Sequence, residues 1–177
     1  QSKYLFRAEN IISGQLFDTD GKLVVNNLHA KHIRVNSKNK TLSAYTNVNA
    51  TLVKRQQNET THTTIQADEL RYFSRHKRTY LYKNIKVQRN QTEIFPEKSI
   101  EIDNDNNVAY IDQGFKLLAE EFVITGNTME ILIDDDYAKI TGGLRGYREK
   151  TPTPDPTIDT REQQLKHQKT YLNCGEM

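Results

Sequence analysis

One pattern of apolar residues occurs four times along this chain of 177 residues. The four segments begin at Leu28 (LHAKHIRV), Ile65 (IQADELRY), Phe95 (FPEKSIEI) and Ile124 (ITGNTMEI), and each has apolar side chains at its first, sixth and eighth positions. A polar cluster suited to a chain reversal follows each segment, and a second apolar segment follows the cluster. A repeat of this kind predicts four similar structural units in series.

The spacing within the repeat is constant. In each unit, 20 positions separate the opening apolar residue from an apolar residue that follows Asn or Gly. Two strands that fold back around a central turn would bring such residues roughly opposite each other, so the spacing predicts four β-hairpins in tandem. The pairs are Leu28 and Val48, Ile65 and Ile85, Phe95 and Phe115, and Ile124 and Leu144.

The apolar residues change parity halfway along the predicted strands. Residues of opposite parity point to opposite faces of a straight strand. A bulge or bend near Asp68 and Asn84 would restore one apolar face and curve the hairpin. Bent hairpins stacked side by side predict an all-β, curled or two-leaved structure with an apolar inside. The residues that show the change are Ile65, Ala67, Leu70 and Tyr72 on the forward strand, and Tyr80, Tyr82, Ile85 and Val87 on the return strand.

The composition is polar for a globular protein. Only 35% of the residues are hydrophobic, but nine Tyr and six Phe argue against full disorder. No run approaches the roughly 18 apolar residues of a membrane span. Residues 1–100 have a formal charge of +9 and residues 101–177 one of −7. This asymmetry suggests an anionic partner for the basic half, although a solvated surface of uneven sign is an equal alternative.

The two ends of the chain differ from the repeat. Three prolines between Pro152 and Pro156 predict an extended linker, so residues 1–147 form the expected domain. Residues 148–177 are expected to be a Pro-rich linker and a polar tail that is poorly ordered or a short helix. Because the chain begins at Gln1, we expect that a signal peptide or a membrane anchor preceded it. The single Cys174 excludes an intramolecular disulfide.

The sequence lacks the motifs of an enzyme or a metal protein. No phosphate-binding loop, nucleophile elbow or dinucleotide fingerprint is present, and no cofactor or metal is expected. Asp103 and the acidic residue two positions later imitate the start of a calcium loop, but Val108 stands where that loop needs Gly, so a plain hairpin turn is predicted. Aromatic and basic residues alternate over 71–83 and could stack on single-stranded nucleic acid. A core position for Tyr80 and Tyr82 is the favoured alternative, and no nucleic-acid partner is expected.

The series of motifs resembles a known family. IQADELRYFSRHKRTYLYKNIKV is similar to the periplasmic proteins of lipopolysaccharide export in the OstA-like β-jellyroll superfamily. FDTDGKLVVNNLHAKHI near the start and TGNTMEILIDDDYAKITGGLRGY near the end resemble the LptC family in particular. Asn47, Asn84, Gly114 and Gly143, with Arg89-Asn90 in place of a Gln-Gly turn, differ from the related LptA pattern. The similarity covers about residues 11–147.

The resemblance implies a non-enzymatic lipopolysaccharide-binding protein. An antiparallel β-jellyroll with an open apolar groove would accept lipid from the inner-membrane ABC transporter and pass it to an LptA-like periplasmic bridge protein. The protein would lie in the periplasm, anchored to the inner membrane by an N-terminal helix absent from this chain. The groove residues expected to contact lipid are Ile12, Tyr45, Val48, Ile65, Leu70, Tyr82, Ile85, Phe95, Ile100, Phe115, Leu117, Met129, Ala138 and Ile140.

Both ends of the jellyroll are expected to pair with neighbouring jellyrolls through open sheet edges. The expected edge residues are Ile11, Leu16 and Phe17 at one end and Leu144 and Tyr147 at the other.

Three alternatives stay open at this stage. They are a soluble LptA-like bridge, a purely structural β-module filled by its own side chains, and a nucleic-acid binder that uses the basic half. A further hypothesis is that the basic half attracts the anionic head group of the lipid, through Arg71, Arg75 and Lys77.

Overall fold

The computed structural model describes residues 5–11, 13–17, 23–56, 59–133, 137–148 and 170–174. The regular structure within these ranges is β-strand, as the repeat predicted, and none of the described residues forms a helix long and apolar enough to cross a membrane. The strands are β1 (Leu5–Ile11), β2 (Leu16–Phe17), β3 (Leu23–Asn36), β4 (Thr41–Gln56), β5 (Glu59–Phe73), β6 (Arg78–Tyr82), β7 (Lys86–Arg89), β8 (Thr92–Pro96), β9 (Ser99–Asp103), β10 (Val108–Ile111), β11 (Phe115–Ala119), β12 (Phe122–Gly126), β13 (Thr128–Leu132), β14 (Tyr137–Thr141), β15 (Leu144–Arg148) and β16 (Thr170–Cys174).

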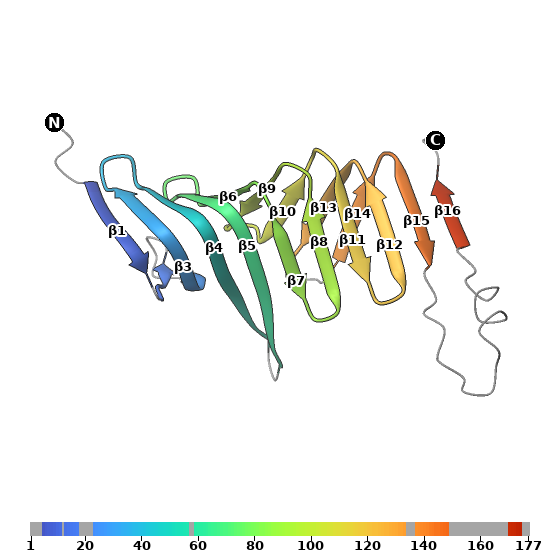
Figure 1. Cartoon of the computed structure of the whole chain (residues 1–177), viewed down its shortest axis with the longest axis horizontal. Coiled ribbons are helices and arrows are strands. Elements are labelled where there is room, and N and C mark those ends of the chain that lie inside the picture. The colour runs from blue at the N-terminus through green and yellow to red at the C-terminus, as the bar shows by residue number, and fades with distance from the viewer. Residues whose placement is uncertain are drawn as a thin grey trace.

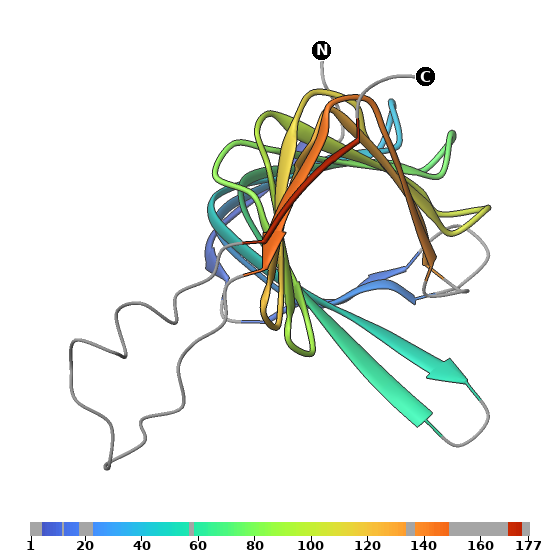
Figure 2. The same ribbon diagram turned by 90° about the vertical axis from the view of Figure 1, so that its right-hand side faces the viewer.

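The strands form two leaves that share their three longest members (Figure 1). β3, β4 and β5 run through both leaves. The first leaf continues from β5 through β6, β9, β10 and β13 to β14, and the second through β7, β8, β11, β12 and β15 to β16. At the opposite end, β1 and β2 each pair with β3. The leaves curl around a common interior (Figure 2), which confirms the antiparallel β-jellyroll of stacked, bent hairpins.

Residues in the left-handed backbone region make the bends between the leaves. Thr46 and Asn47 have φ angles of 64° and 54°, and Lys83 and Asn84 have φ angles of 60° and 48°. Asn and Gly tolerate this region best, which explains why the repeat places one of them before each returning apolar residue. Gly114 and Gly143 have φ angles of 82° and 59° at the corresponding places of the third and fourth units.

The bend predicted near Asp68 and Asn84 is confirmed. The Asp68 amide donates to the carbonyl of Lys83 at 2.9 Å, and the Asn84 side-chain amide donates to the Asp68 carboxylate at 2.7 Å. Beyond this bend, β5 exchanges its partner β6 for β7. The forward strand therefore keeps one buried face across its change of parity, with Ile65, Ala67, Leu70 and Tyr72 all buried.

The predicted inner face of the return strand is wrong. Leu81 is buried on the core side of β6, so its neighbours Tyr80 and Tyr82 lie on the outer face, where their rings stack at 6.3 Å. The physical reason is the bend at the left-handed pair Lys83-Asn84, where the return strand has one residue more than the forward strand. Leu81 and Ile85 therefore have the same parity, and both face the core. An outward tyrosine also keeps its hydroxyl near water, whereas leucine has no polar group to satisfy.

The third unit is one residue out of step with the pattern read from the sequence. Ile94 packs against the core, and Pro96 is buried, so the intervening Phe95 lies on the outer face. Glu97 and Lys98 form an exposed corner before β9, which returns the core to Ile100. Three residues separate the buried Pro96 from the buried Ile100, whereas only two separate Ala67 from Leu70 in the second unit.

The acidic segment after β9 is a hairpin turn, as predicted. The Asp103 carboxylate accepts hydrogen bonds from the amides of Asp105 and Asn106 at 3.0 and 3.1 Å and pairs with Arg78 at 2.9 Å. Asp103 thereby holds a turn and an ion pair between β6 and β9.

Part of the expected tail belongs to the sheet. Residues 170–174 form β16, which pairs with β15. They are neither loose nor helical, so the expectation does not hold for these five residues. Most of the remaining tail, residues 149–169 and 175–177, lies outside the described residues.

Candidate functional site

A cleft of about 420 Å³ opens between the two leaves. Apolar side chains from both leaves line most of it, and five of them (Ile65, Ile100, Ile102, Ala109 and Leu117) also belong to the buried core. The wall of the cleft is therefore the inner surface of the jellyroll itself. The remaining apolar lining residues are Leu52, Val87, Ile94, Ile131, Ile133 and Ala138.

Polar groups contribute to the same cleft at the turn between β7 and β8. Arg89 and Thr92 end the two strands, Asn90 forms the turn, and Thr63 pairs with Arg89 on the neighbouring strand. Val87 and Arg89 have the same parity on β7, which places Arg89 on the inner side of the sheet. The cleft thus combines an apolar interior with a basic and hydroxyl-bearing rim.

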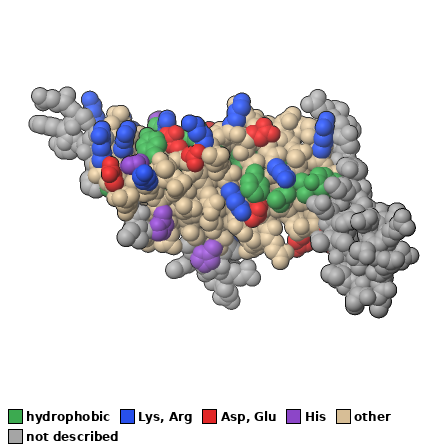
Figure 3. All heavy atoms as spheres, in the orientation of Figure 1, with side chains coloured by type: hydrophobic (Ala, Val, Ile, Leu, Met, Phe, Trp, Pro, Cys, Tyr) green, Lys and Arg blue, Asp and Glu red, His purple; other side chains and the backbone are tan. Residues whose placement is uncertain are grey.

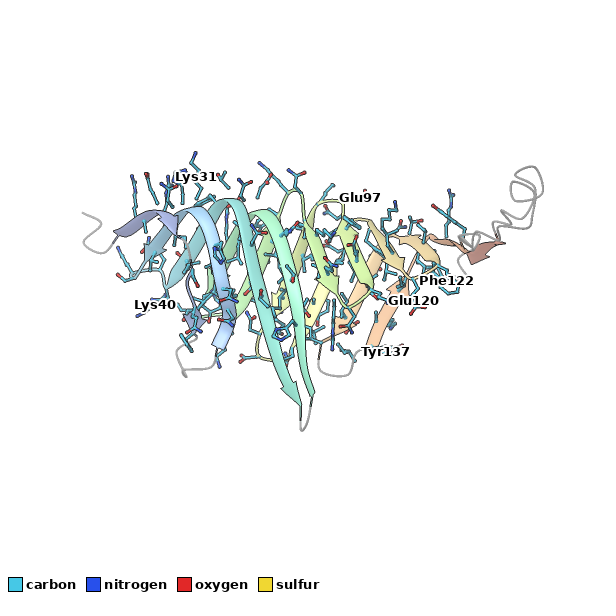
Figure 4. All side chains as sticks on the ribbon, turned by 60° about the horizontal axis from the view of Figure 1, so that its bottom comes forward. Lys31, Lys40, Glu97, Glu120, Phe122 and Tyr137 are labelled. Atoms are coloured by element: carbon cyan, nitrogen blue, oxygen red, sulfur yellow. The ribbon has the colours of Figure 1, made fainter. Side chains whose placement is uncertain are left out.

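Two exposed aromatic side chains lie on the side of the molecule that comes forward in Figure 4, one from each leaf. Phe122 of β12 is 42% exposed, and Tyr137 of β14 is 56% exposed and lines the cleft. Phe122 pairs with Ala119, which packs against the core, so it lies on the core side of its leaf. Exposed aromatic groups beside an apolar cleft are typical of a binding surface.

The structure brings together most of the residues predicted to face the groove. Ile65, Ile100, Leu117 and Ala138 line the cleft. Five more are buried in the core next to it, and Ile140 packs against that core. Ile12 lies outside the described residues. The five buried residues are Val48, Leu70, Ile85, Phe115 and Met129.

Three of the predicted inward residues face outward instead. Tyr82 lies on the outer face as described above, and Lys86 Nζ lies 5.7 Å from the ring centre of Phe95, on the outer side of the second leaf. Tyr45 follows the fully buried Ala44 and lies under Arg34, whose guanidinium carbon is 5.6 Å from the ring centre. A strand alternates its faces at every residue, so the neighbour of a buried side chain points away from the core.

The face of the molecule seen in Figure 3 carries basic, acidic and hydrophobic side chains. Arg71 bonds to Glu69 and lies over the ring of Tyr82 at 5.4 Å. The hydrogen bond to Glu69 raises the pKa of Arg71 above its ordinary value. Desolvation and the negative charge of Glu101 raise the pKa of Tyr80.

Tyr80 and Tyr82 lie on the outer face, so the core position that was favoured over nucleic-acid stacking does not hold for them. Arg71 lies over the ring of Tyr82 and is therefore on the outer face too, away from the cleft. Lys77 does not line the cleft and is paired with Asp105 at 2.9 Å. The basic residue that the structure does place at the cleft is Arg89.

The predicted edge residues divide into two groups. Ile11 belongs to β1, and Leu16 and Phe17 form β2. Among the described strands, β1 and β2 pair with β3 alone. Leu144 and Tyr147 belong to β15, which lies between β12 and β16, so their predicted place at an open edge is wrong. The second leaf instead ends with β16, and the first leaf ends with β14.

Several lining residues were missed by the sequence pattern. Ile94 was missed because the third unit is out of step, and Arg89 and Asn90 because their turn was considered only as a difference from a related family. Thr63 lies two residues before Ile65, and Arg89 lies two residues after Val87. Alternation along the two strands would therefore have predicted that both face the cleft. Ile131 and Ile133 follow Met129 at intervals of two and carry the same signal.

The described residues contain no group of His, Cys, Asp or Glu side chains arranged to hold a metal ion. The cleft itself offers an apolar surface with few directional polar groups. Such a surface can shelter hydrocarbon from water and impose little selection on its exact position.

The sequence comparisons agree with this geometry. Residues 8–149 match the family described as lipopolysaccharide-assembly, LptC-related. The match extends from β1 to the residue after β15 and so includes every residue that lines the cleft. No curated protein matches the chain.

Proposed function

Because the chain belongs to the LptC-related family of lipopolysaccharide-assembly proteins, which serves lipopolysaccharide transport, we propose that the cleft between its two leaves holds the acyl chains of lipopolysaccharide during transfer. The single observation that carries this proposal is the apolar cleft, whose lining comes from both leaves and ends in a polar rim at Arg89. An amphiphile has the matching division into an apolar and an anionic part.

The physical chemistry of the cleft supports a carrier rather than a tight receptor. Each methylene group removed from water contributes about 0.8 kcal/mol. Aliphatic side chains such as Ile100, Ile131 and Leu117 provide this stabilisation without fixing the position of the chain. A lipid can therefore be held in water and still move along the groove.

We place the protein on the periplasmic side of the inner membrane, between the lipopolysaccharide ABC transporter and an LptA-like bridge. The ATPase of the transporter would supply the energy for movement. An open edge is needed for a neighbouring jellyroll to continue a leaf by strand addition. In the described structure β14 pairs only with β13, and β1 and β2 pair only with β3.

A matched pair of substitutions on β13 tests the proposal. Ile131 lines the cleft, and Glu130 next to it pairs with the exposed Tyr110 on the outer face. Ile131→Glu places a charge in the apolar cleft and is expected to weaken lipopolysaccharide binding by about tenfold or more, since burying an unpaired charge is costly. Glu130→Gln is expected to leave the affinity unchanged, as measured with purified protein and a fluorescent lipopolysaccharide.

Two outcomes of this experiment would favour another function. If the unaltered protein binds no lipopolysaccharide, the chain is a structural β-module filled by its own side chains. If it binds oligonucleotides instead, with an affinity that falls steeply with salt and with Tyr82→Ala, the outer aromatic face is the functional surface.

A further inference from the structure

A second hollow, of about 560 Å³, lies on the outer face of the first leaf, at the bends of the neighbouring strands β5, β6 and β9. Its volume is in the range of sites that hold small molecules. No residue that lines it also lines the cleft, and Glu97, which borders it, lies at the opposite edge of the molecule from Tyr137 in Figure 4. The lining residues are Glu69 and Arg71 of β5, Tyr82 of β6, Lys83 after β6, and Glu97 and Lys98 before β9.

The longer corner of the third unit forms one wall of this hollow. The corner between β8 and β9 has one residue more than the corresponding corner of the second unit, and it supplies Glu97 and Lys98. The amide of Lys83 donates to the carbonyl of Lys98 at 3.5 Å, so the corner lies beside the bend that follows β6. A Cβ atom at Gly114 would lie 2.7 Å from Oε2 of Glu97, so this carboxylate is seated against the glycine backbone. The corner thus offers a hydrogen-bond donor and an acceptor next to each other.

The other wall is held in place by contacts among its own side chains. Arg71 bonds to Glu69 and lies over the ring of Tyr82 at 5.4 Å. The same ring stacks with Tyr80, at 6.3 Å between the ring centres. A guanidinium that is already held by a carboxylate and an aromatic ring loses little freedom when a ligand binds. This wall is therefore arranged before a ligand arrives.

The charges of the hollow favour an anionic ligand that also has hydroxyl groups. Three of the lining residues are basic and two are acidic. Glu69 is engaged by Arg71, whereas the ammonium groups of Lys83 and Lys98 form no ion pair within the described part of the chain. Ammonium groups donate to carboxylate or phosphate oxygens, and the Glu97 carboxylate can accept from hydroxyl groups. A sugar unit that bears a carboxylate or a phosphate has both kinds of group.

We propose that this hollow binds a negatively charged sugar unit of a glycan, at a site separate from the lipid cleft. A nucleotide fits the hollow less well, because the ring of Tyr82 already stacks with Tyr80 and lies under Arg71, and the two carboxylates would repel a chain of phosphates. In the compartment proposed above, such a sugar has two sources. One is the saccharide part of lipopolysaccharide, and the other is the glycan of the cell wall.

Isothermal titration calorimetry of the purified chain tests the site with four soluble probes. They are the lipid-free saccharide of lipopolysaccharide, a peptidoglycan fragment, neutral maltoheptaose and oligothymidine. At least one of the first two should bind, and the last two should not. Binding of the first alone would identify the transported glycan as the ligand, binding of the second alone would identify the cell wall, and binding of both would indicate a site for acidic sugars in general.

Substitutions of Lys98 show whether the glycan binds in the hollow. Lys98→Glu should weaken binding by about tenfold or more, because a charge-assisted hydrogen bond is replaced by repulsion. Lys98→Arg keeps the charge and should largely preserve binding. Lys83→Glu makes the first change at the neighbouring lysine and decides if Lys98→Glu does not fold. Lys116→Glu is the matched control, since it makes the same change on the exposed outer face of β11, away from the hollow, and should leave the affinity unchanged.

Three results would overturn the proposal. They are no binding of either acidic glycan at about 1 mM, binding of maltoheptaose or oligothymidine with the same affinity, or an equal loss for Lys98→Glu and Lys116→Glu. Ile131→Glu, which changes the cleft, should leave the affinity for the lipid-free glycan unchanged. A failure of this site would therefore leave the proposed lipid transport untouched, and a failure to hold lipid in the cleft would leave this site untouched.

Discussion

The aromatic ring of Phe115 packs directly on the backbone of Gly126, its partner across β11 and β12. A Cβ atom at residue 126 would lie 2.9 Å from the ring carbons of Phe115 and 3.1 Å from Cγ2 of Ile140. Phe115 is among the largest fully buried side chains, so its ring has little room to move. The absence of a side chain at this position allows the two leaves to close around Phe115.

Gly126→Ala is therefore expected to lower the free energy of unfolding by about 1–3 kcal/mol, as overpacking does in a dense core. Urea denaturation of the purified protein measures this loss. Gly14→Ala is the matched control, because a Cβ there would meet only the carbonyl oxygen of Leu28, at 3.6 Å. It should change stability by less than about 0.5 kcal/mol.

Replacing the ring should compensate for the added methyl group. Phe115→Leu combined with Gly126→Ala is expected to be less destabilised than the sum of the two single variants, because the smaller side chain makes room for the methyl. Strict additivity of the two free-energy changes would contradict direct packing between these residues.

The hydrogen bonds and the ion pair of Asp103 predict a specific dependence of stability on pH. Burial would raise the pKa of the Asp103 carboxyl, but hydrogen bonds from Asn106, the charge of Arg78 and the Asp105 amide outweigh burial and lower the pKa below its ordinary value of 3.8. The unfolded chain therefore takes up this proton at a higher pH than the folded chain does. The stabilisation is complete well above pH 3.8 and is lost as the pH falls through the lower folded pKa.

Asp103→Asn should remove this dependence. The variant is expected to be less stable than the unaltered protein by about 1–3 kcal/mol at pH 7, where a charged acceptor is lost, and the difference should shrink towards pH 3. Urea midpoints measured at several pH values test this. A difference that stays constant with pH would mean that Asp103 contributes through shape rather than charge.

Much of the architecture could be predicted from the sequence, because the repeat depends on local chemistry. Asn and Gly mark the left-handed bends, and the constant spacing of 20 residues follows from hairpins of equal depth. The inner faces of β6 and β8 could not be read in this way. One extra residue at a bend reverses the parity of a strand, and only the pairing of β5 with β6 and of β8 with β11 reveals it.

The pairing of β16 with β15 could not be predicted for a different reason. Residues 170–174 contain no alternating pattern, and a strand at the end of a sheet is stabilised mainly by backbone hydrogen bonds, which leave no mark on side-chain order. The polar rim of the cleft was missed since it depends on where a turn lies in space. Arg89 reaches the cleft because the turn at Asn90 ends on the rim.

Arg89 is expected to recognise the phosphate groups of the lipid. Arg89→Glu should weaken lipopolysaccharide binding by about tenfold, because a charge-assisted hydrogen bond is replaced by repulsion. Lys116→Glu makes the same change of charge on the exposed outer face of β11 and is the control. Titration of fluorescent lipopolysaccharide at two salt concentrations measures both variants, and an equal loss for the two would indicate general electrostatic attraction.

The central claim, that lipid occupies the cleft between the leaves, is tested most directly by photo-crosslinking in cells. A photoreactive amino acid is introduced at Ala138, which lines the cleft, or at Lys139, the next residue of β14, which is exposed and points the other way. The account predicts that the probe at residue 138 captures lipopolysaccharide and that the probe at residue 139 does not. Equal capture at both positions, or capture at neither, would contradict it.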